Sequence, residues 1–214
     1  SPIEDLLIKK GLSKAIDSRF VATVTRDPRV SNGNPFQVEV GLIFGGDLPG
    51  DQPIQVLRFA NRVPLMYQQG GCLLTKALES VNWKQYGLDH PGGRGIPKGA
   101  AAILIHLAST NVQFTSEAKE ALSDNEVVSE ELEKAMKEVG RGLRSHLKKS
   151  VQKKKAQEKF ELVNIILPEI HDKTIGILNA EPVPLAPIIT KIMNAVFLEE
   201  KVEWEAETKV TRAT

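Results

Sequence analysis

The sequence has a single cysteine, Cys72, among 214 residues. No disulfide can form within the chain, and this composition is typical of a protein that works in a reducing compartment. The sequence also lacks an excess of charge of one sign, since 28 Lys and Arg residues stand against 27 Asp and Glu. The total charge therefore argues neither for nor against a nucleic-acid partner, and only its distribution along the chain can decide.

Long apolar runs are missing as well. No stretch approaches the roughly 20 residues that a membrane-spanning helix needs, and the first residues are too acidic and too short in apolar length for a secretory signal. The chain has no initiator methionine, and residues 201–214 alternate apolar and polar side chains as a half-buried strand does. We expect the sequence to be a fragment of a longer protein.

Recognisable catalytic signatures are absent too. The sequence contains no paired carboxylates, no GxSxG and no HExxH, and its four scattered histidines with one cysteine do not suggest a zinc site. Residues 92–95, Gly-Gly-Arg-Gly, lack the GK[ST] of a phosphate-binding loop and precede a strand, which favours a simple connector. His106 lies in a buried strand run, where a hydrogen-bonded core histidine is the simpler interpretation. Nothing in the sequence predicts a reaction carried out by this chain alone.

The apolar patterns that are present predict an α+β fold. Alternation and buried runs predict strands at residues 20–26, 35–46, 54–64 and 100–110, and helical spacing predicts a helix over Tyr67–Val81. Residues 1–15 are interpreted as the tail of a helix and a linker, with Gly11 as its cap. Ser123 and Glu126 form a capping-box pattern ahead of a long helix. This order predicts a four-stranded sheet with helices packed on one face.

The long helix separates apolar from basic residues. One stripe at spacings of three and four comprises Val128, Leu132, Met136, Val139, Leu143 and Leu147. At about 100° per residue, the opposite face carries Lys137, Arg141, Arg144, Lys148 and Lys155. The stripe fades after Leu147 while lysines continue, which predicts a helix that leaves its domain as a basic arm. A new apolar segment begins at Phe160, and a further helix is expected from Ile188 to Leu198.

Three features are candidates for binding. Trp83 and Tyr86 flank Lys84 closely enough for base stacking beside a phosphate contact, although the simpler interpretation is that the two aromatic residues cap the core. The basic helix face supplies several cations on one side, as phosphate binding requires, but it could also be a solvated face or an anchor for an acidic partner. Lys119 follows a buried strand in a short loop, where a lysine is usually just solvated.

Several ordered motifs resemble one family. LRFANRVPLMYQQGGCLLTKAL, WKQYGL and HLASTNVQFTSEAKEAL resemble segments of the B subunit of DNA topoisomerase VI, a type IIB topoisomerase. The opening VTRDPRVSNGNPFQVEVGLIFGGDL is similar to the start of that family's transducer domain. The resemblance runs from about residue 2 to the basic helix near residue 160.

The resemblance implies a domain plan. Residues 1–16 would end a preceding helical insert or linker, residues 17–150 would form the transducer, residues 151–200 a helical stalk with C-terminal helices, and residues 201–214 the start of a further β domain or a truncated strand. The transducer fold of this family is similar to the second domain of ribosomal protein S5, extended here by the long basic helix. The family's ATP-binding domain, of the type shared with gyrase, histidine kinases and MutL, would lie outside this chain.

The resemblance also implies function. Lys119 matches the loop lysine that the family offers to the γ-phosphate of ATP, and Trp83, Lys84 and Tyr86 match a WKxY segment implicated in DNA binding. The family's stalk docks the A subunit that cuts DNA, in a complex of two A and two B subunits that uses ATP and Mg²⁺ and joins its B subunits on ATP binding.

The chain is accordingly expected to be part of an ATP-hydrolysing topoisomerase, an isomerase acting on double-stranded DNA in strand passage, and to be inactive as a fragment. Its location would be the cytoplasm of an archaeal cell, with the nucleoid, or the nucleus in a plant. The alternative is a stand-alone nucleic-acid-binding or scaffold module without any link to ATP.

Overall fold

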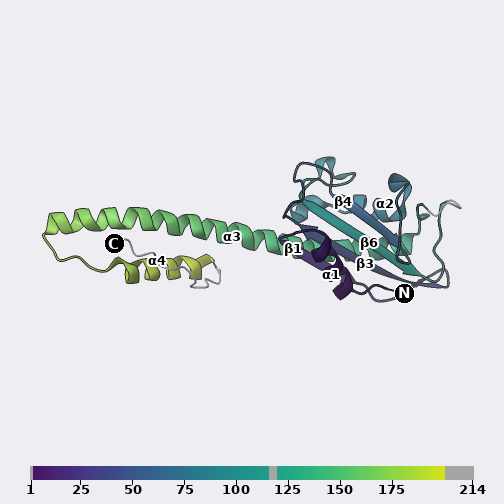
Figure 1. The fold of residues 1–214 in the computed structure, drawn as a ribbon, viewed down its shortest axis with the longest axis horizontal. Helices are drawn as coiled ribbons and strands as arrows, with labels where there is room; N and C mark the ends of the chain where they lie inside the picture. The colour runs from purple at the N-terminus through teal and green to yellow at the C-terminus, as the bar shows by residue number, and fades with distance from the viewer. Residues whose placement is uncertain (1, 116–119, 201–214) are drawn as a thin grey trace. The chain divides into compact units, whose positions relative to one another are not determined.

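The computed structural model describes residues 2–115 and 120–200, with side chains described up to residue 195. Contacts divide the chain into two compact units, residues 1–146 and 147–214. A long helix, α3 (Glu126–Leu178), contributes residues to both units (Figure 1). Among the helices that the structure describes, none has the length and apolar character to cross a membrane.

The first unit is built on a six-stranded mixed sheet. Its strands are β1 (Phe20–Thr25), β2 (Arg29–Ser31), β3 (Asn34–Phe44), β4 (Gln55–Ala60), β5 (Val63–Pro64) and β6 (Ala101–Ser109). The order is β1-β3-β6-β4-β5, with β2 also pairing with β3, and only the β4–β6 pair is parallel. The predicted α+β fold is confirmed, and its four strands correspond to β1, β3, β4 and β6. The expected count was too low, because two short strands were missed.

Both additional strands are formed by two-residue hairpins. Asn32-Gly33 joins β2 to β3, and Asn61-Arg62 joins β4 to β5, with positive φ angles of 49° and 76° in the first turn and 49° and 69° in the second. Two successive positive φ angles are typical of the type I′ turn, whose twist matches that of paired strands. The predicted strand at 54–64 is therefore divided by a turn, and β2 lies between the strands predicted at 20–26 and 35–46.

Helices cover both faces of this sheet, which corrects the prediction of helices on one face. Helix α1 (Asp5–Ala15) places Ile8 and Leu12 over Gly41 of β3. A Cβ atom at Gly41 would lie 2.6 Å from Leu12 Cδ1, so this close approach requires glycine. Gly11 lies inside α1 and is not its cap. Residues 1–15 were interpreted as the tail of a helix and a linker. They contain the helix α1, which packs on the sheet through Ile8 and Leu12.

The opposite face of the sheet packs against α3, beside α2 (Leu73–Ser80). Gly142 of α3 is close to Phe20 and Ala22 of β1, while Ser80 of α2 donates a hydrogen bond to Glu133 of α3. The predicted apolar stripe is confirmed from Val128 to Leu143, where all five of its residues are buried. Helix α2 is shorter than the helix expected at residues 67–81.

The start of α3 is capped differently from the prediction. Ser123 Oγ donates to the carbonyl of Gln113 at 3.1 Å, so it does not cap the helix. The N–H of Val128 donates instead to Asn125 Oδ1 at 3.1 Å, which is the usual N-cap geometry. The capping-box prediction was wrong because Ser123 is held in the loop that precedes α3.

The second unit contains the rest of α3 and α4 (Leu185–Glu200). Its described core is small, with Ala156 and Met193 buried and with Phe160, Val163 and Ile189 packed against them. The apolar segment expected to begin at Phe160 belongs to α3, which continues through Pro168. The helix expected at Ile188–Leu198 lies within α4. Residues 201–214, predicted to be a strand, lie outside the described residues.

Candidate functional site

Lys119 lies outside the described residues, but the two sides of its loop are described. Phe114 and Leu122 form an antiparallel β-bridge, and the N–H of Thr115 donates to the carbonyl of Ala121 at 2.9 Å. Thr115 Oγ1 donates to the same carbonyl at 3.3 Å. Residues 114–115 and 121–122 therefore form the paired base of the loop that carries Lys119, and we refer to them as the loop base.

The loop base is bonded to the start of α2. The N–H of Leu73 donates to the carbonyl of Leu122 at 3.1 Å, and the N–H of Leu122 meets Cys72 Sγ at 3.5 Å. Two residues further on, Asp124 accepts from Lys76 Nζ at 2.7 and 2.8 Å. A displacement of the loop base would therefore pull on α2 through the backbone bond between Leu122 and Leu73 and not only through side-chain packing.

Asn125 links the same segment to the start of α3 and to the sheet. Its Oδ1 caps α3, and the side chain exchanges hydrogen bonds with Ser31 Oγ of β2 at 3.1 and 3.0 Å. Only three positions separate Asn125 from the loop base at Leu122. The short stretch from Leu122 to Val128 thus connects the loop base to the first turn of α3. Asn125 also connects this stretch to β2.

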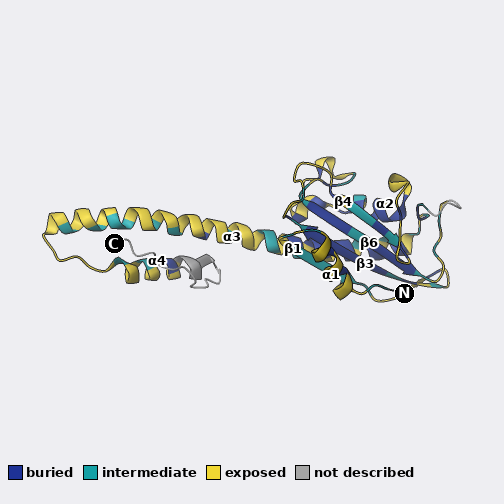
Figure 2. Cartoon of the chain, in the orientation of Figure 1, coloured by how far each residue is buried: buried dark blue, intermediate teal, exposed yellow. Residues whose placement is uncertain are grey.

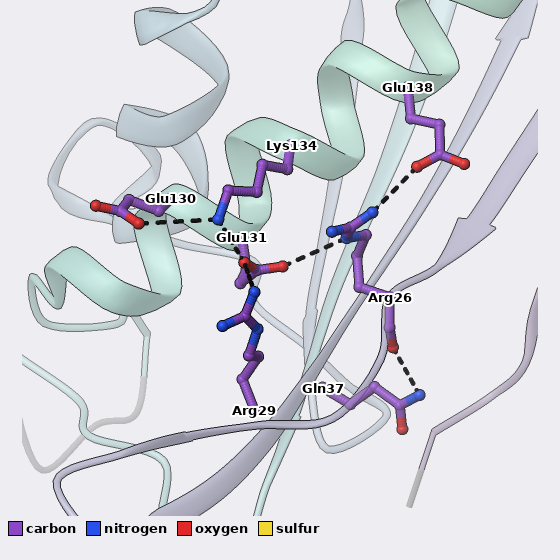
Figure 3. A network of polar contacts seen from close by, with 7 residues as sticks. All are labelled: Arg26, Arg29, Gln37, Glu130, Glu131, Lys134 and Glu138. Atoms are coloured by element: carbon purple, nitrogen blue, oxygen red, sulfur yellow. Dashed lines mark hydrogen bonds and ion pairs between the residues drawn. The ribbon is translucent and has the colours of Figure 1, made fainter.

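A charge network fastens the following turns of α3 to the sheet (Figure 3). The Glu131 side chain is only 4% exposed, and it pairs with Arg26 at 3.3 Å, with Arg29 at 3.3 Å and with Lys134 at 2.7 Å. Arg26 also pairs with Glu138 at 3.3 Å. Burial raises the pKa of Glu131, but the bonds and charges of Lys134, Arg26 and Arg29 outweigh it, so the pKa lies below its ordinary value.

The predicted stacking residues lie in the core. Trp83 and Tyr86 belong to a short 3-10 turn and are 0% and 6% exposed. The Trp83 indole N–H donates to the carbonyl of Leu78 at 2.8 Å, and the Tyr86 ring fills the space that a Cβ at Gly140 would need. No face of Trp83 is open for a base. This is the core-cap alternative, and within the turn only Lys84 carries an exposed cation.

The basic residues of α3 are exposed as their spacing predicted, with one exception. Lys137 is half-buried and pairs with Glu133 at 3.0 Å. Arg141 and Arg144 of the first unit are exposed, and so are Lys148 and Lys155 of the second. Within the part of the chain that the structure describes, these last four residues form no ion pair, so their charges are available to a phosphate.

The two buried histidines are structural. His106 is fully buried, its Nδ1 lies 2.6 Å from Glu39 Oε2, and its Nε2 accepts the N–H of Arg62 at 3.0 Å. The core-histidine interpretation is confirmed. His90 Nε2 lies 2.8 Å from the carbonyl of Gly95, so it holds the glycine-rich loop. Among the described residues, no group of three potential ligands could hold a metal ion.

Sequence reasoning missed Asn125, Ser31 and Glu131. The two partners of Asn125, Ser31 and Val128, are 94 and 3 positions away, and only the nearer one leaves a local pattern. Glu131 sits in a run of helix glutamates that looks like an ordinary solvated face. The arginines that bury it come from a strand end about a hundred residues earlier, which no spacing rule detects.

Comparison with known proteins identifies the first 159 residues. They match the family model described as the transducer of the topoisomerase VI B subunit. The B subunit of type 2 DNA topoisomerase 6 from Methanosarcina barkeri is 48% identical over 203 residues, which are 95% of this chain and 32% of that protein. The protein of the same name from Archaeoglobus fulgidus is 43% identical over 210 residues, 98% of this chain and 35% of its own.

The chain therefore spans about a third of the length of these relatives. Among solved structures, the DNA gyrase B protein from Myxococcus xanthus is similar with a TM-score of 0.42 and 18% identity. That similarity covers 64% of this chain and 38% of the gyrase chain.

Proposed function

This chain belongs to the family of topoisomerase VI B subunit transducers, and we propose that it relays the nucleotide state of an ATP-dependent type IIB DNA topoisomerase to the subunit that cleaves DNA. The relatives are about three times longer than the region matched, so ATP binding and DNA cleavage are assigned to parts outside these residues. The relay serves strand passage through double-stranded DNA, in relaxation and decatenation.

One observation carries this proposal: the loop base is bonded to the start of α2, and Asn125, three positions after the loop base, caps the start of α3. Leu122 is bonded to α2, and Asn125 caps α3 while holding Ser31 of β2. Helix α3 spans 53 residues, from Glu126 to Leu178. A change at the loop can therefore reach a long stiff element through a few short hydrogen bonds.

Lys119 acts, in this proposal, as the sensor of the nucleotide. Its ammonium group reaches the γ-phosphate of ATP bound with Mg²⁺ by the remainder of the B subunit, and it loses that contact when hydrolysis removes the phosphate. The nucleophile for DNA cleavage and its metal site belong to the A subunit. The burial of Tyr86 beside Gly140 agrees with this division, because a tyrosine in that position cannot attack DNA.

DNA contacts are assigned to the exposed cations. Lys84 at the 3-10 turn, and Arg141, Arg144, Lys148 and Lys155 on α3, meet phosphates, while Trp83 and Tyr86 position the turn from the core. Lys137, which is half-buried and paired with Glu133, would have to leave that pair to join them. The partners are the A subunit, a second B subunit that joins on ATP binding, and double-stranded DNA, in the cytoplasm of an archaeal cell or the nucleus in a plant.

The direct test replaces Lys119 by alanine in the full-length B subunit assembled with its A subunit. We expect ATP binding to persist while hydrolysis and relaxation of supercoiled DNA fall by about two orders of magnitude, as when one preorganised charge-stabilising group is removed from a reacting centre. Lys9→Ala, which removes an exposed lysine of α1, is the matched control and should change nothing. Full activity of Lys119→Ala would show that Lys119 is not the nucleotide sensor.

A second test decides whether the exposed arginines of α3 contact DNA. Binding of duplex DNA should weaken as salt rises, and the double variant Arg141→Ala with Arg144→Ala should reduce the slope of log affinity against log salt by about 2. Lys9→Ala with Lys10→Ala changes the net charge equally on α1 and should leave the slope alone. An unchanged slope in the α3 variant would show that these arginines form a solvated face and do not contact DNA phosphates.

A further inference from the structure

The three residues before α1 are held by a polar cluster in which Glu39 and His106 are fully buried in the sheet and Arg62 is exposed in the β4–β5 turn. We propose that Glu39, His106 and Arg62 together fix the direction in which residues 2–4 enter the transducer. We call this three-residue cluster the joint. Its members are positioning residues for the relay. The inference rests on the proposed function, since a relay needs a firm attachment at residues 2–4, before α1, as well as at α3.

Glu39 is fully buried in β3, and its carboxylate accepts hydrogen bonds at both oxygens. Oε1 accepts the N–H of Glu4 at 2.6 Å and Thr25 Oγ1 at 3.1 Å. Oε2 accepts the N–H of Ile3 at 2.8 Å and lies 2.6 Å from His106 Nδ1. The donors come from the segment before α1, from β1 and from β6, so one carboxylate ties this segment to three neighbouring strands.

His106 extends the cluster to the β4–β5 turn. Its Nε2 accepts the N–H of Arg62 at 3.0 Å, so the ring proton belongs on Nδ1, where it is donated to Glu39. The Arg62 side chain returns to the segment before α1, where Nη2 donates to the carbonyl of Pro2 at 2.7 Å. Residues 2–4 are therefore held at two amides by Glu39 and at one carbonyl by Arg62.

The backbone at this point is strained. Glu4 has φ 77° and ψ 144°, a conformation that non-glycine residues rarely adopt and that persists only when the surroundings impose it. Burial raises the pKa of the Glu39 carboxyl, but the bonds from His106, Ile3 and Glu4 outweigh it, so the group stays ionised at neutral pH. An apolar pair could fill the same space, but it could not orient two backbone amides.

The joint shares a strand with the attachment of α3. Glu39 and Gln37 both belong to β3, and β3 pairs with β2, whose Ser31 is bonded to Asn125 at the start of α3. Arg26, which pairs with Glu131 of α3, also accepts from Gln37 at its backbone carbonyl. A force applied at residues 2–4 therefore enters β3, which reaches α3 through its pairing with β2 and through the bond from Gln37 to Arg26.

The test uses the full-length B subunit assembled with its A subunit. Glu39→Gln puts an NH₂ group among the donors that surround the carboxylate, and Arg62→Asn removes the contact to Pro2 while keeping a residue that tolerates the positive φ of the turn. Arg94→Ala is the control, because Arg94 is exposed in another loop and has no ion pair among the described residues. Two quantities are measured: hydrogen exchange at the amides of Ile3 and Glu4, and DNA strands passed per ATP hydrolysed.

We expect both variants to exchange these amides faster and to pass about fivefold to tenfold fewer strands per ATP, the size of a usual coupling between sites, while ATP is still hydrolysed. Arg94→Ala should match wild type in both measurements. Faster exchange with an unchanged yield per ATP would overturn the joint and leave the cluster a structural anchor. If Glu39→Gln fails to fold, Arg62→Asn decides alone. Wild-type relaxation that does not depend on ATP would overturn the proposed relay itself.

Discussion

The two units use the same helix in different ways. Over residues 126–146, α3 buries Leu132, Met136 and Leu143 completely and has the Glu131 carboxylate surrounded by cations. Over residues 147–178, most side chains are exposed, among them Ile177 at 82% and Leu178 at 68% (Figure 2). The apolar residues of the second stretch have no comparable core to join, since the described buried residues of the second unit are Ala156 in α3 and Met193 in α4.

The difference teaches that apolar content does not measure how much a helix segment contributes to folding. Burial stabilises a protein only where another element removes the side chain from water. In the first unit the sheet removes the apolar side chains of α3 from water. The ion pairs also hold α3 at one position along the sheet. We expect the free energy of unfolding to reside mainly in the first unit, and three matched substitutions test this expectation.

The largest effect is expected for leucine truncation. Leu132→Ala should lower the free energy of unfolding by about 2–5 kcal/mol, because it removes a fully buried side chain and leaves a cavity. Leu178→Ala makes the same chemical change at an exposed site and should stay within about 0.5 kcal/mol of wild type. Urea unfolding followed by circular dichroism measures both variants. Equal losses would mean that the second stretch is packed as firmly as the first.

An intermediate effect is expected for carboxylates. Glu131→Gln should cost about 2 kcal/mol, because it removes charge-assisted bonds from Arg26, Arg29 and Lys134 at a buried site. Glu158→Gln breaks an exposed pair with Lys154 at 3.9 Å and should cost about 0–0.5 kcal/mol. Thermal unfolding at neutral pH compares the two, and a larger loss at Glu158 would contradict the comparison.

The Glu131 effect should depend on pH in a defined direction. Its folded-state pKa lies below the ordinary value of 4.5, so the folded protein binds fewer protons than the unfolded chain. The stabilisation is complete above pH 4.5 and is lost as the pH falls through the folded-state pKa. The difference in stability between wild type and Glu131→Gln should therefore shrink in acid. A difference that stays constant down to about pH 2 would show that Glu131 acts by shape alone.

The smallest effect is expected for two glycines inside α3. A Cβ at Gly140 would lie 2.7 Å from the Tyr86 ring, so Gly140→Ala should destabilise the protein by about 1–2 kcal/mol. Gly176 has open space around it, and Gly176→Ala should stabilise the helix by about 0.5–1 kcal/mol through its higher helix propensity. Chemical denaturation of the two variants should give shifts of opposite sign. A gain at Gly140 would mean that Tyr86 moves away easily.

Much of the fold followed from local patterns. Strands β1, β3 and β6 and the buried stripe of α3 were predictable because each is a long run with one period. The two-residue hairpins at Asn32-Gly33 and Asn61-Arg62 were missed, although the Asn-Gly pair is a strong turn signal. Asn61-Arg62 carries no such signal, and its positive φ angles are held by bonds to Ser109 and His106 from a distant strand.

The candidate site was less predictable than the fold. The exposure of Arg141, Arg144, Lys148 and Lys155 followed from helical spacing, because α3 has a covered side and an open side. The burial of Trp83 and Tyr86 was one of two alternatives that the sequence left open, since the Trp83 bond to Leu78 and the packing of Tyr86 against Gly140 depend on tertiary structure. The role of Lys119 stays a prediction from the family motif.

The sequence by itself determined the family, the α+β class and the separation of apolar from basic residues along α3, because these depend on motif order and short-range periodicity. Only the tertiary structure decided that Asn125 caps α3 while holding Ser31, that Glu131 is buried among cations, and that Glu39 grips residues 2–4. These bonds join residues as far as 105 positions apart. Their partners are set by the packing of strands and helices, which leaves no repeat or spacing in the chain.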